Sequence, residues 1–248
     1  MCIFAFYFIK PKLYKTMKKL LLIVAFSCFA VLAMAQNVQL HYDFGKANDD
    51  RAADRDYLTA TVEFFKPDKW GSTFFFVDFD FNAEDDGISV SYMELARNFK
   101  FNQTFPVQAH LEYNGGHFGA DGFGDSFKNM VIVGGYYDWK ITKGFTLGTM
   151  LGYKYIQDVE EGPDFQATVT WFKPFGKGFL FTGFADLWTE DKWGEKDGKK
   201  FIFVSEPQLW YSVTEHFKVG TEVEFSNNFV LGSNKFEIMP TVAVRWDI

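Results

Sequence analysis

The chain has 248 residues, of which 25 are lysine or arginine and 32 are aspartate or glutamate, giving a net charge of −7. This excess of acid argues against nucleic acid as a partner, because phosphate backbones repel it. Aromatic residues make up 20% of the chain and include 32 phenylalanines. After residue 35, however, no apolar run approaches the roughly 18 residues that a membrane helix needs. The apolar side chains must therefore be accommodated by another kind of structure.

The first 35 residues are expected to direct export. From residue 17 the chain reads MKKLLLIVAFSCFAVLAMAQ, with the charged start, apolar stretch and A-x-A cleavage site of a secretory signal peptide. We predict cleavage before Gln36 and interpret residues 1–16 as a wrongly included upstream start; an uncleaved anchor helix is the alternative. The mature chain would keep 20 basic and 32 acidic residues, a net charge of −12, and would lose both cysteines, Cys2 and Cys28. Such a chain has no disulfide framework.

From Gln36 onward, apolar residues alternate with polar ones in segments of about ten residues, the pattern of strands with one apolar face. Twelve such segments can be recognised, the fourth less clearly than the others. They lie near residues 38–44, 58–64, 74–81, 88–97, 107–113, 131–139, 145–155, 165–171, 179–187, 201–211, 217–225 and 236–248. An even number of strands is typical of barrels in the bacterial outer membrane.

The connections between these segments alternate in character. Those after odd segments are mostly long and acidic or glycine-rich, such as KANDDRAADR and GGHFGADGFGDSF, which we interpret as surface loops. Those after even segments are compact and carry lysine, such as KPDKWG and KITKG. Long outer loops and short periplasmic turns indicate an all-β, twelve-stranded antiparallel transmembrane β-barrel over residues 36–248. In lipid every backbone polar group needs a partner, so the sheet is expected to close.

The last segment, FEIMPTVAVRWDI, alternates up to the end of the chain. It resembles the terminal strand that the barrel-assembly machinery recognises, although such strands usually end in phenylalanine. We therefore expect the barrel-assembly machinery and outer-membrane lipid as partners, in the outer membrane of a Gram-negative bacterium.

An internal repeat supports the strand count. The stretch ATVEFFKP at residues 60–67 returns as ATVTWFKP at residues 167–174. Each copy is followed by a glycine-containing turn and an aromatic strand with an aspartate, Asp78 in the first copy and Asp186 in the second. A weaker echo links VSYMEL at 90–95 with VSEPQL at 204–209. This spacing predicts six strands per half; the alternative is that two barrel hairpins reuse common residues.

The stretch FFFVDFDF at residues 74–81 separates the two faces of one strand. Successive side chains point to opposite faces, so one face is wholly apolar and the other carries two rings and two carboxylates. An unpaired carboxylate is too costly for a dry core, and we place the second face in a water-filled lumen. The candidate solute-binding residues combine rings that can stack a flat solute with polar groups that can bind hydroxyls: Phe74, Phe76, Asp78, Asp80, Glu94, Phe184, Asp186, Trp188 and Gln208. The alternative is that the rings only fill a narrow barrel.

The stretches YLTATVEFFKPDKWGSTFFFVDFDF, SYMELARNFKF and SEPQLWYSV resemble the nucleoside-specific, channel-forming Tsx-like outer-membrane proteins. The resemblance covers about half of the mature chain. It implies a monomeric twelve-stranded channel that passes nucleosides over several weak sites, with Phe74, Phe76, Asp78 and Glu94 at matching positions. It also suggests that Arg97 pairs with Glu94, although strict alternation puts Arg97 on the lipid face.

We find no pattern for catalysis or for a cofactor. A barrel phospholipase would need a His-x-Ser stretch, which none of the four histidines provides. The pair of Asp78 and Asp80 with His41 or His110 nearby is a weak constellation for a protease, and without cysteine or paired histidines a metal site is not expected. The sequence therefore predicts a channel for passive uptake of small solutes, with nucleosides as the leading candidate. The alternative is a structural or surface-interaction barrel.

Overall fold

The computed structural model describes residues 36–47, 55–83, 87–102, 104–120, 123–159, 163–192, 198–230 and 233–248. Residues Gln36–Ile248 form one compact unit. The predicted signal peptide, residues 1–35, lies outside the described residues. Within the described ranges, no helix is long and apolar enough to cross a membrane.

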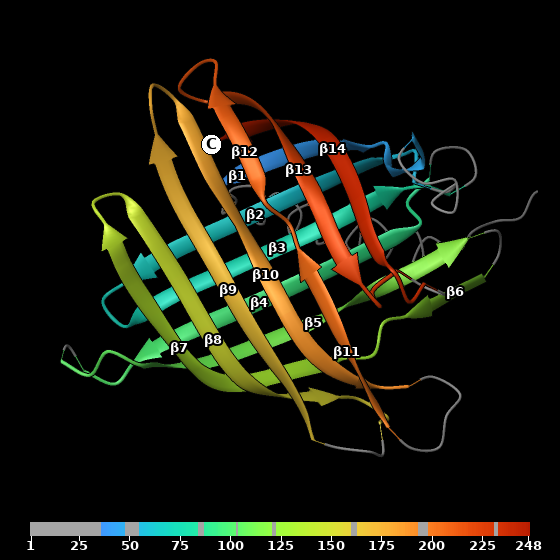
Figure 1. The fold of residues 1–248 in the computed structure, drawn as a ribbon, viewed down its shortest axis with the longest axis horizontal. Coiled ribbons are helices and arrows are strands. Elements are labelled where there is room, and N and C mark those ends of the chain that lie inside the picture. Colours follow the sequence, from blue (N-terminus) through green and yellow to red (C-terminus); the bar gives the residue numbers. More distant parts are fainter. Residues whose placement is uncertain are drawn as a thin grey trace, which may run out of the picture. The chain divides into compact units, whose positions relative to one another are not determined.

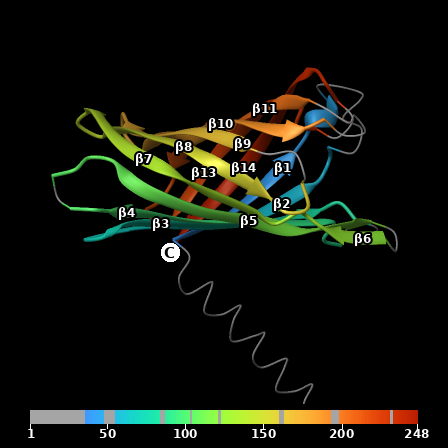
Figure 2. The same cartoon turned by 90° about the horizontal axis from the view of Figure 1, so that it is seen from below.

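The described chain is a single antiparallel sheet that closes on itself (Figures 1 and 2). The first strand pairs with both the second and the last, so the blue and red ends of the colour scale lie side by side in Figure 1. The strands are β1 (Asn37–Asp43), β2 (Leu58–Asp68), β3 (Gly71–Phe81), β4 (Val90–Lys100), β5 (Gln108–Ala120), β6 (Phe123–Ser126), β7 (Met130–Thr142), β8 (Phe145–Ile156), β9 (Asp164–Phe175), β10 (Phe179–Asp191), β11 (Lys199–Ser205), β12 (Gln208–Ser212), β13 (Phe217–Asn227) and β14 (Phe236–Asp247). A 3₁₀ turn, η1 (Gly45–Ala47), follows β1.

These segments make twelve positions around the barrel. β11 and β12 both pair with β10 on one side and β13 on the other, so they are two parts of one strand. β6 pairs only with the end of β5 and adds no position to the ring. The twelve-stranded barrel predicted from the alternation is confirmed, with each strand close to its expected place.

Exposure alternates along several strands, most clearly β1, β8 and β14, as the sequence predicts. In β8, Leu151 is 67% exposed whereas its neighbour Met150 is 4% exposed. The exposed row includes many large apolar side chains, among them Leu40, Val133, Phe201 and Phe236. An apolar belt on the outside of a closed sheet is what a lipid environment requires. The polar rows point inward, where β1 buries Gln39 and His41.

The internal repeat is visible in the strand register. Thr61 lies opposite Asp78 where β2 meets β3, and its hydroxyl donates to Asp78 Oδ1 at 2.5 Å. Thr168, the repeat equivalent of Thr61, lies opposite Asp186 where β9 meets β10. β9 follows β2 by six barrel strands. The same threonine–aspartate pairing therefore occurs once in each half.

Two details differ from the sequence-based expectation. The strand predicted over 201–211 is interrupted at Glu206 and Pro207, because proline has no N–H to donate to the ladder. Opposite the interruption, Gly183 has a φ of +141°, and a Cβ there would lie 2.2 Å from the Glu206 carbonyl oxygen. Glycine allows this close approach.

The second difference concerns the stretch GGHFGADGFGDSF, which was predicted to be a surface loop. Much of it is strand: β5 continues to Ala120 and pairs with β4 up to Phe118, and β6 pairs back onto β5. The two strands project beyond their neighbours at one end of the barrel (Figures 1 and 2). Glycine weakens strands on average, but pairing with an existing neighbour outweighs that preference.

Candidate functional site: the lumen

The interior of the barrel is partly filled by its own side chains. Trp210 and Ile132 are 0% exposed and Met239 is 1% exposed. These three side chains come from β12, β7 and β14. A barrel of this size is expected to fill part of its interior. Many of the other inward side chains gather in four sets, three of them polar and one aromatic.

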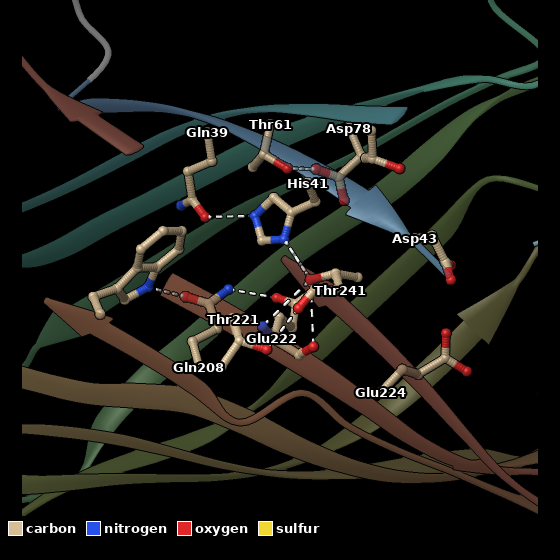
Figure 3. Close-up of polar contacts among 12 residues, drawn as sticks. Gln39, His41, Asp43, Thr61, Asp78, Gln208, Thr221, Glu222, Glu224 and Thr241 are labelled. Atoms are coloured by element: carbon tan, nitrogen blue, oxygen red, sulfur yellow. Dashed lines mark hydrogen bonds and ion pairs between the residues drawn. The ribbon is translucent and has the colours of Figure 1, made fainter. Parts of the chain in front are cut away.

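The first set, the His41 network, joins β1, β12, β13 and β14 (Figure 3). The His41 ring contacts Gln39 Oε1 at 2.9 Å and Thr241 Oγ1 at 3.2 Å. Gln208 donates to Glu222 Oε2 at 2.5 Å and accepts from the Trp210 indole N–H at 2.9 Å. Glu222 Oε1 lies 3.7 Å from His41 Nδ1. Satisfied networks of this kind make the interior rigid.

The second set, the Arg55 fork, lies where β1 ends and β2 begins. Arg55 Nε is 2.6 Å from Asp43 Oδ2, and its Nη2 is 2.7 Å from Glu224 Oε2. Its backbone carbonyl accepts from the Lys46 N–H at 3.0 Å, which fixes the start of the side chain. Burial lowers the pKa of the Arg55 guanidinium, but the carboxylates of Glu224 and Asp43 outweigh it, so the pKa lies above its ordinary value. The fork is a permanent positive charge between two buried carboxylates.

The third set is a row of rings across β3, β4, β5 and the segment after β6, which we call the aromatic ladder. The Phe74 and Phe76 centroids are 5.8 Å apart, and Phe76 is 6.0 Å from Tyr92. Phe127 continues the row at 5.8 Å from Tyr92, and Phe118 lies 5.1 Å from Phe127. Such separations are favourable for aromatic contacts, and the row offers successive ring faces and edges to a flat solute.

The fourth set, the Glu112 cluster, consists of Glu94, Glu112, Asn114, Lys154 and Asp186, whose ionisable members interact electrostatically with one another. Asn114 Nδ2 lies 3.4 Å from Glu94 Oε1, and these two residues are opposite each other in the register of β4 and β5. Ile132 lies beside Glu112 on one side and Lys154 on the other. The set lies on β4, β5, β8 and β10, whereas the His41 network lies on β1, β12, β13 and β14.

The structure divides the predicted site residues among these sets. Phe74 and Phe76 belong to the aromatic ladder, Gln208 to the His41 network, and Glu94 and Asp186 to the Glu112 cluster. Trp188 adjoins that cluster, with Lys154 Nζ 4.4 Å from its ring centroid, and its indole donates to Glu190 at 2.8 Å. The residues are thus not gathered at one point. The other three predicted site residues belong to none of the four sets. Asp78 and Asp80 accept hydrogen bonds from Thr61 and Thr59, respectively, and Phe184 lies opposite Thr170 in the strand register.

The suggested pairing of Arg97 with Glu94 is wrong. Arg97 lies on the outer face of β4, as strict alternation requires, and binds both carboxylate oxygens of Asp68 at 2.8 and 3.0 Å. It also donates to Thr73 at 2.9 Å. Glu94 instead accepts from the Tyr92 hydroxyl at 2.9 Å. No bulge intervenes between Glu94 and Arg97 in the register of β4.

Several lumen residues were missed as members of the site. Tyr92 lies in the segment whose alternation was least clear, and Phe118 and Phe127 lie within the stretch interpreted as a loop. Arg55 lies in a long connection, where the sequence has no alternation that would show whether a side chain points into the lumen. Glu112, by contrast, is on the inward row of a clear segment and was overlooked only because nothing in one strand identifies its partners. Among the described residues, no three histidine, cysteine, aspartate or glutamate side chains are grouped to hold a metal ion.

Comparison with known proteins bears on the fold. Residues 35–248 match the family described as "Domain of unknown function (DUF5020)". No curated protein sequence matches the chain. Among solved structures, the chain is similar to the NanC porin, with a TM-score of 0.56, 11% identity and coverage of 86% of this chain and 99% of that one. It is also similar to the KdgM porin, with a TM-score of 0.50, 9% identity and the same two coverages.

A further similar structure, LpxR from Salmonella typhimurium, has a TM-score of 0.44 at 9% identity, over 86% of this chain and 100% of that one. That score is too low to carry an argument. At the identities of the two porins the likeness shows the fold alone: the chain is a β-barrel of the kind found in the Gram-negative outer membrane, as predicted. Neither porin is named as a nucleoside channel, so the resemblance to the Tsx-like family stays a prediction.

Proposed function

Because the chain belongs to the family described as a domain of unknown function (DUF5020), we propose its function from the lumen itself. It is a monomeric channel for passive uptake of small, neutral or weakly cationic solutes, with nucleosides as the leading candidate. The observation that carries this proposal is the aromatic ladder, which places Phe76 between Phe74 and Tyr92 on the inner wall of a porin barrel. Elsewhere on that wall lie carboxylates and amides that suit hydroxyl groups.

In this proposal a nucleoside moves along the ladder by exchanging one weak contact for the next. The base stacks on Phe74, Phe76 or Tyr92, and ribose hydroxyls donate to carboxylates such as Asp78 and Glu94. Each contact has to be weak, because a channel that binds tightly does not release its solute. Acidic groups in the lumen repel phosphate, so nucleotides are disfavoured.

Uptake into liposomes that contain the refolded barrel tests this function, with adenosine, AMP and a sugar of similar size as solutes. Adenosine should enter faster than AMP and the sugar, and Phe76→Ala should slow adenosine. Phe75→Ala is the matched control, since Phe75 is the neighbouring ring on the outer face of β3. Equal entry of all three solutes, with no effect of Phe76→Ala, would indicate a general pore instead.

The second candidate is a structural or surface-interaction barrel without transport. The filled part of the interior favours it, since Trp210, Ile132 and Met239 are almost fully enclosed. In this case the rings and polar networks serve only to stabilise a closed barrel. Adenosine entry no faster than into empty liposomes would establish this reading.

A further inference from the structure

The Glu112 cluster contains hydrogen-bond acceptors that have no partner. Glu112 Oε1, Asn114 Oδ1 and Asp186 Oδ1 are enclosed by the protein and accept no hydrogen bond. Glu112 is 7% exposed and Asn114 is 2% exposed. Buried polar groups are nearly always hydrogen-bonded, and an unsatisfied one costs about 1–3 kcal/mol. All three atoms are oxygens that only accept, so the missing partner is a donor.

The groups around these atoms are held in place by other contacts. Glu112 accepts from the His110 ring through its other oxygen, at 3.0 Å, and the second nitrogen of that ring lies 2.8 Å from Asn98 Oδ1. The Asn114 amide is directed to Glu94 at 3.4 Å. Glu112 and Asn114 therefore present their free oxygens from side chains whose other polar atoms are engaged, which is the arrangement of a preorganised site.

The charge of the cluster indicates which kind of donor fits. Glu94, Glu112 and Asp186 are three carboxylates, and the cation within the cluster is Lys154. That ammonium donates to Gln166 Oε1 at 3.0 Å and lies 4.4 Å from the Trp188 ring centroid. Gln166 and Trp188 hold Lys154, so a single ammonium accompanies three carboxyl groups. An added cation would stabilise their ionised forms.

We propose that the Glu112 cluster is a binding site for a small organic solute that carries a protonated primary amine. An ammonium group has N–H donors and no acceptor, so it supplies both the donors that the unpartnered oxygens lack and a charge that the carboxyl groups attract. A metal ion fits less well, because among the described residues no three acidic, histidine or cysteine side chains lie close enough together to hold one. The proposal rests on the proposed channel function and extends it, because it adds amines to the solutes that the lumen selects.

Binding is tested directly by calorimetry on the refolded barrel in detergent, with 1,4-diaminobutane as the probe. The neutral diol 1,4-butanediol, of the same length, is the comparison. We expect the diamine to bind and the diol to bind at least about tenfold more weakly. Glu112→Gln should weaken diamine binding about tenfold, because it removes a charge and one acceptor. Equal binding of the two probes, or unchanged binding to Glu112→Gln, overturns the site.

Two further variants keep the test decisive. Glu63→Gln is the matched control, because Glu63 is another lumen carboxylate but accepts from Asn37 at 2.9 Å; diamine binding should be unchanged. Asn114→Asp adds a carboxylate at the site and should tighten binding several-fold, which protects the test if Glu112→Gln fails to fold. Weaker or unchanged binding to Asn114→Asp counts against the proposal.

Adenosine uptake measured on the same preparation separates this proposal from the channel function. Diamine binding without adenosine uptake would keep the site and overturn the channel. Adenosine uptake without diamine binding would keep the channel and overturn the site.

Discussion

Single residues in the lumen depend on partners that lie far away in the sequence. Arg55 precedes β2, yet it joins Asp43 of β1 to Glu224 of β13. The side chains of both carboxylates are at most 8% exposed, and that of Arg55 is 23% exposed. Because the guanidinium keeps its charge at every working pH, this end of the lumen contains a fixed cation in acidic surroundings.

We predict that Arg55→Ala makes the channel more selective for cations, because it leaves Asp43 and Glu224 without a counter-charge. The measurement is the reversal potential of planar bilayers in a KCl gradient. The variant should also lower the free energy of unfolding by about 3 kcal/mol. This value is at the low end of the cost of breaking a buried ion pair, because Arg55 is partly exposed. Lys46→Ala is the control, since its ion pair with Asp56 at 3.5 Å is at the surface and contributes little.

At the scale of the element, each strand has to satisfy lipid on one face and the lumen on the other. Leu151 of β8 is exposed to lipid, whereas Thr168 of the neighbouring β9 faces inward, opposite Asp186. The same substitution at these two positions therefore has different consequences.

Leu151→Arg should lower the stability of the barrel by about 2–4 kcal/mol, the cost of a cation on the lipid face near the bilayer midplane. Thr168→Arg should cost much less, because the new guanidinium faces polar groups that include Asp186. Urea unfolding in lipid vesicles gives both values. The reverse order would mean that the two faces are inverted.

The interrupted strand gives a second prediction at this scale. A Cβ at Gly183 would lie 2.2 Å from the Glu206 carbonyl oxygen and 2.9 Å from the Trp171 ring, on a backbone with positive φ. Gly183→Ala should therefore destabilise the barrel by about 1–3 kcal/mol, the cost of strain at such a residue. Gly135→Ala is the matched control, because its Cβ would meet Val107 Cγ1 at the tolerable distance of 3.4 Å. If both variants unfold at the wild-type urea concentration, the interruption is flexible enough to absorb the clash.

At the scale of the whole molecule, the carboxylates on the inner wall act together. Asp43, Asp78, Asp186, Glu94, Glu112 and Glu222 come from six different strands, and closure of the sheet turns all of them toward one space. We expect the wild-type channel to prefer K⁺ over Cl⁻. The preference should weaken between 0.1 M and 1 M salt, since screening shortens from about 10 Å to about 3 Å over that range. Anion preference at 0.1 M would contradict the acidic lumen.

Much of the fold is local in origin and could be predicted from the sequence. The faces of β3 and β8 follow from a period of two, the twelve strands follow from its repetition, and Thr168 could be matched to Thr61 because the repeated stretches are similar. The position of Arg97 on the outer face also follows from strict alternation. These properties need no knowledge of which strand lies beside which.

The candidate site could be predicted only in part. Alternation identifies Phe76 and Glu94 as lumen residues, but it does not show that Phe76 meets Tyr92 or that Phe127 extends the same row. It does not show that Asn114 and Glu112 keep unpartnered oxygens, or that Arg55 reaches Glu224 across 169 positions of sequence. Such contacts depend on strand register and on the closure that places β14 beside β1, which bring distant residues together. The sequence therefore determined which side chains enter the lumen, and the tertiary structure decided which of them meet, because alternation belongs to one strand whereas a contact across the lumen belongs to the closed sheet.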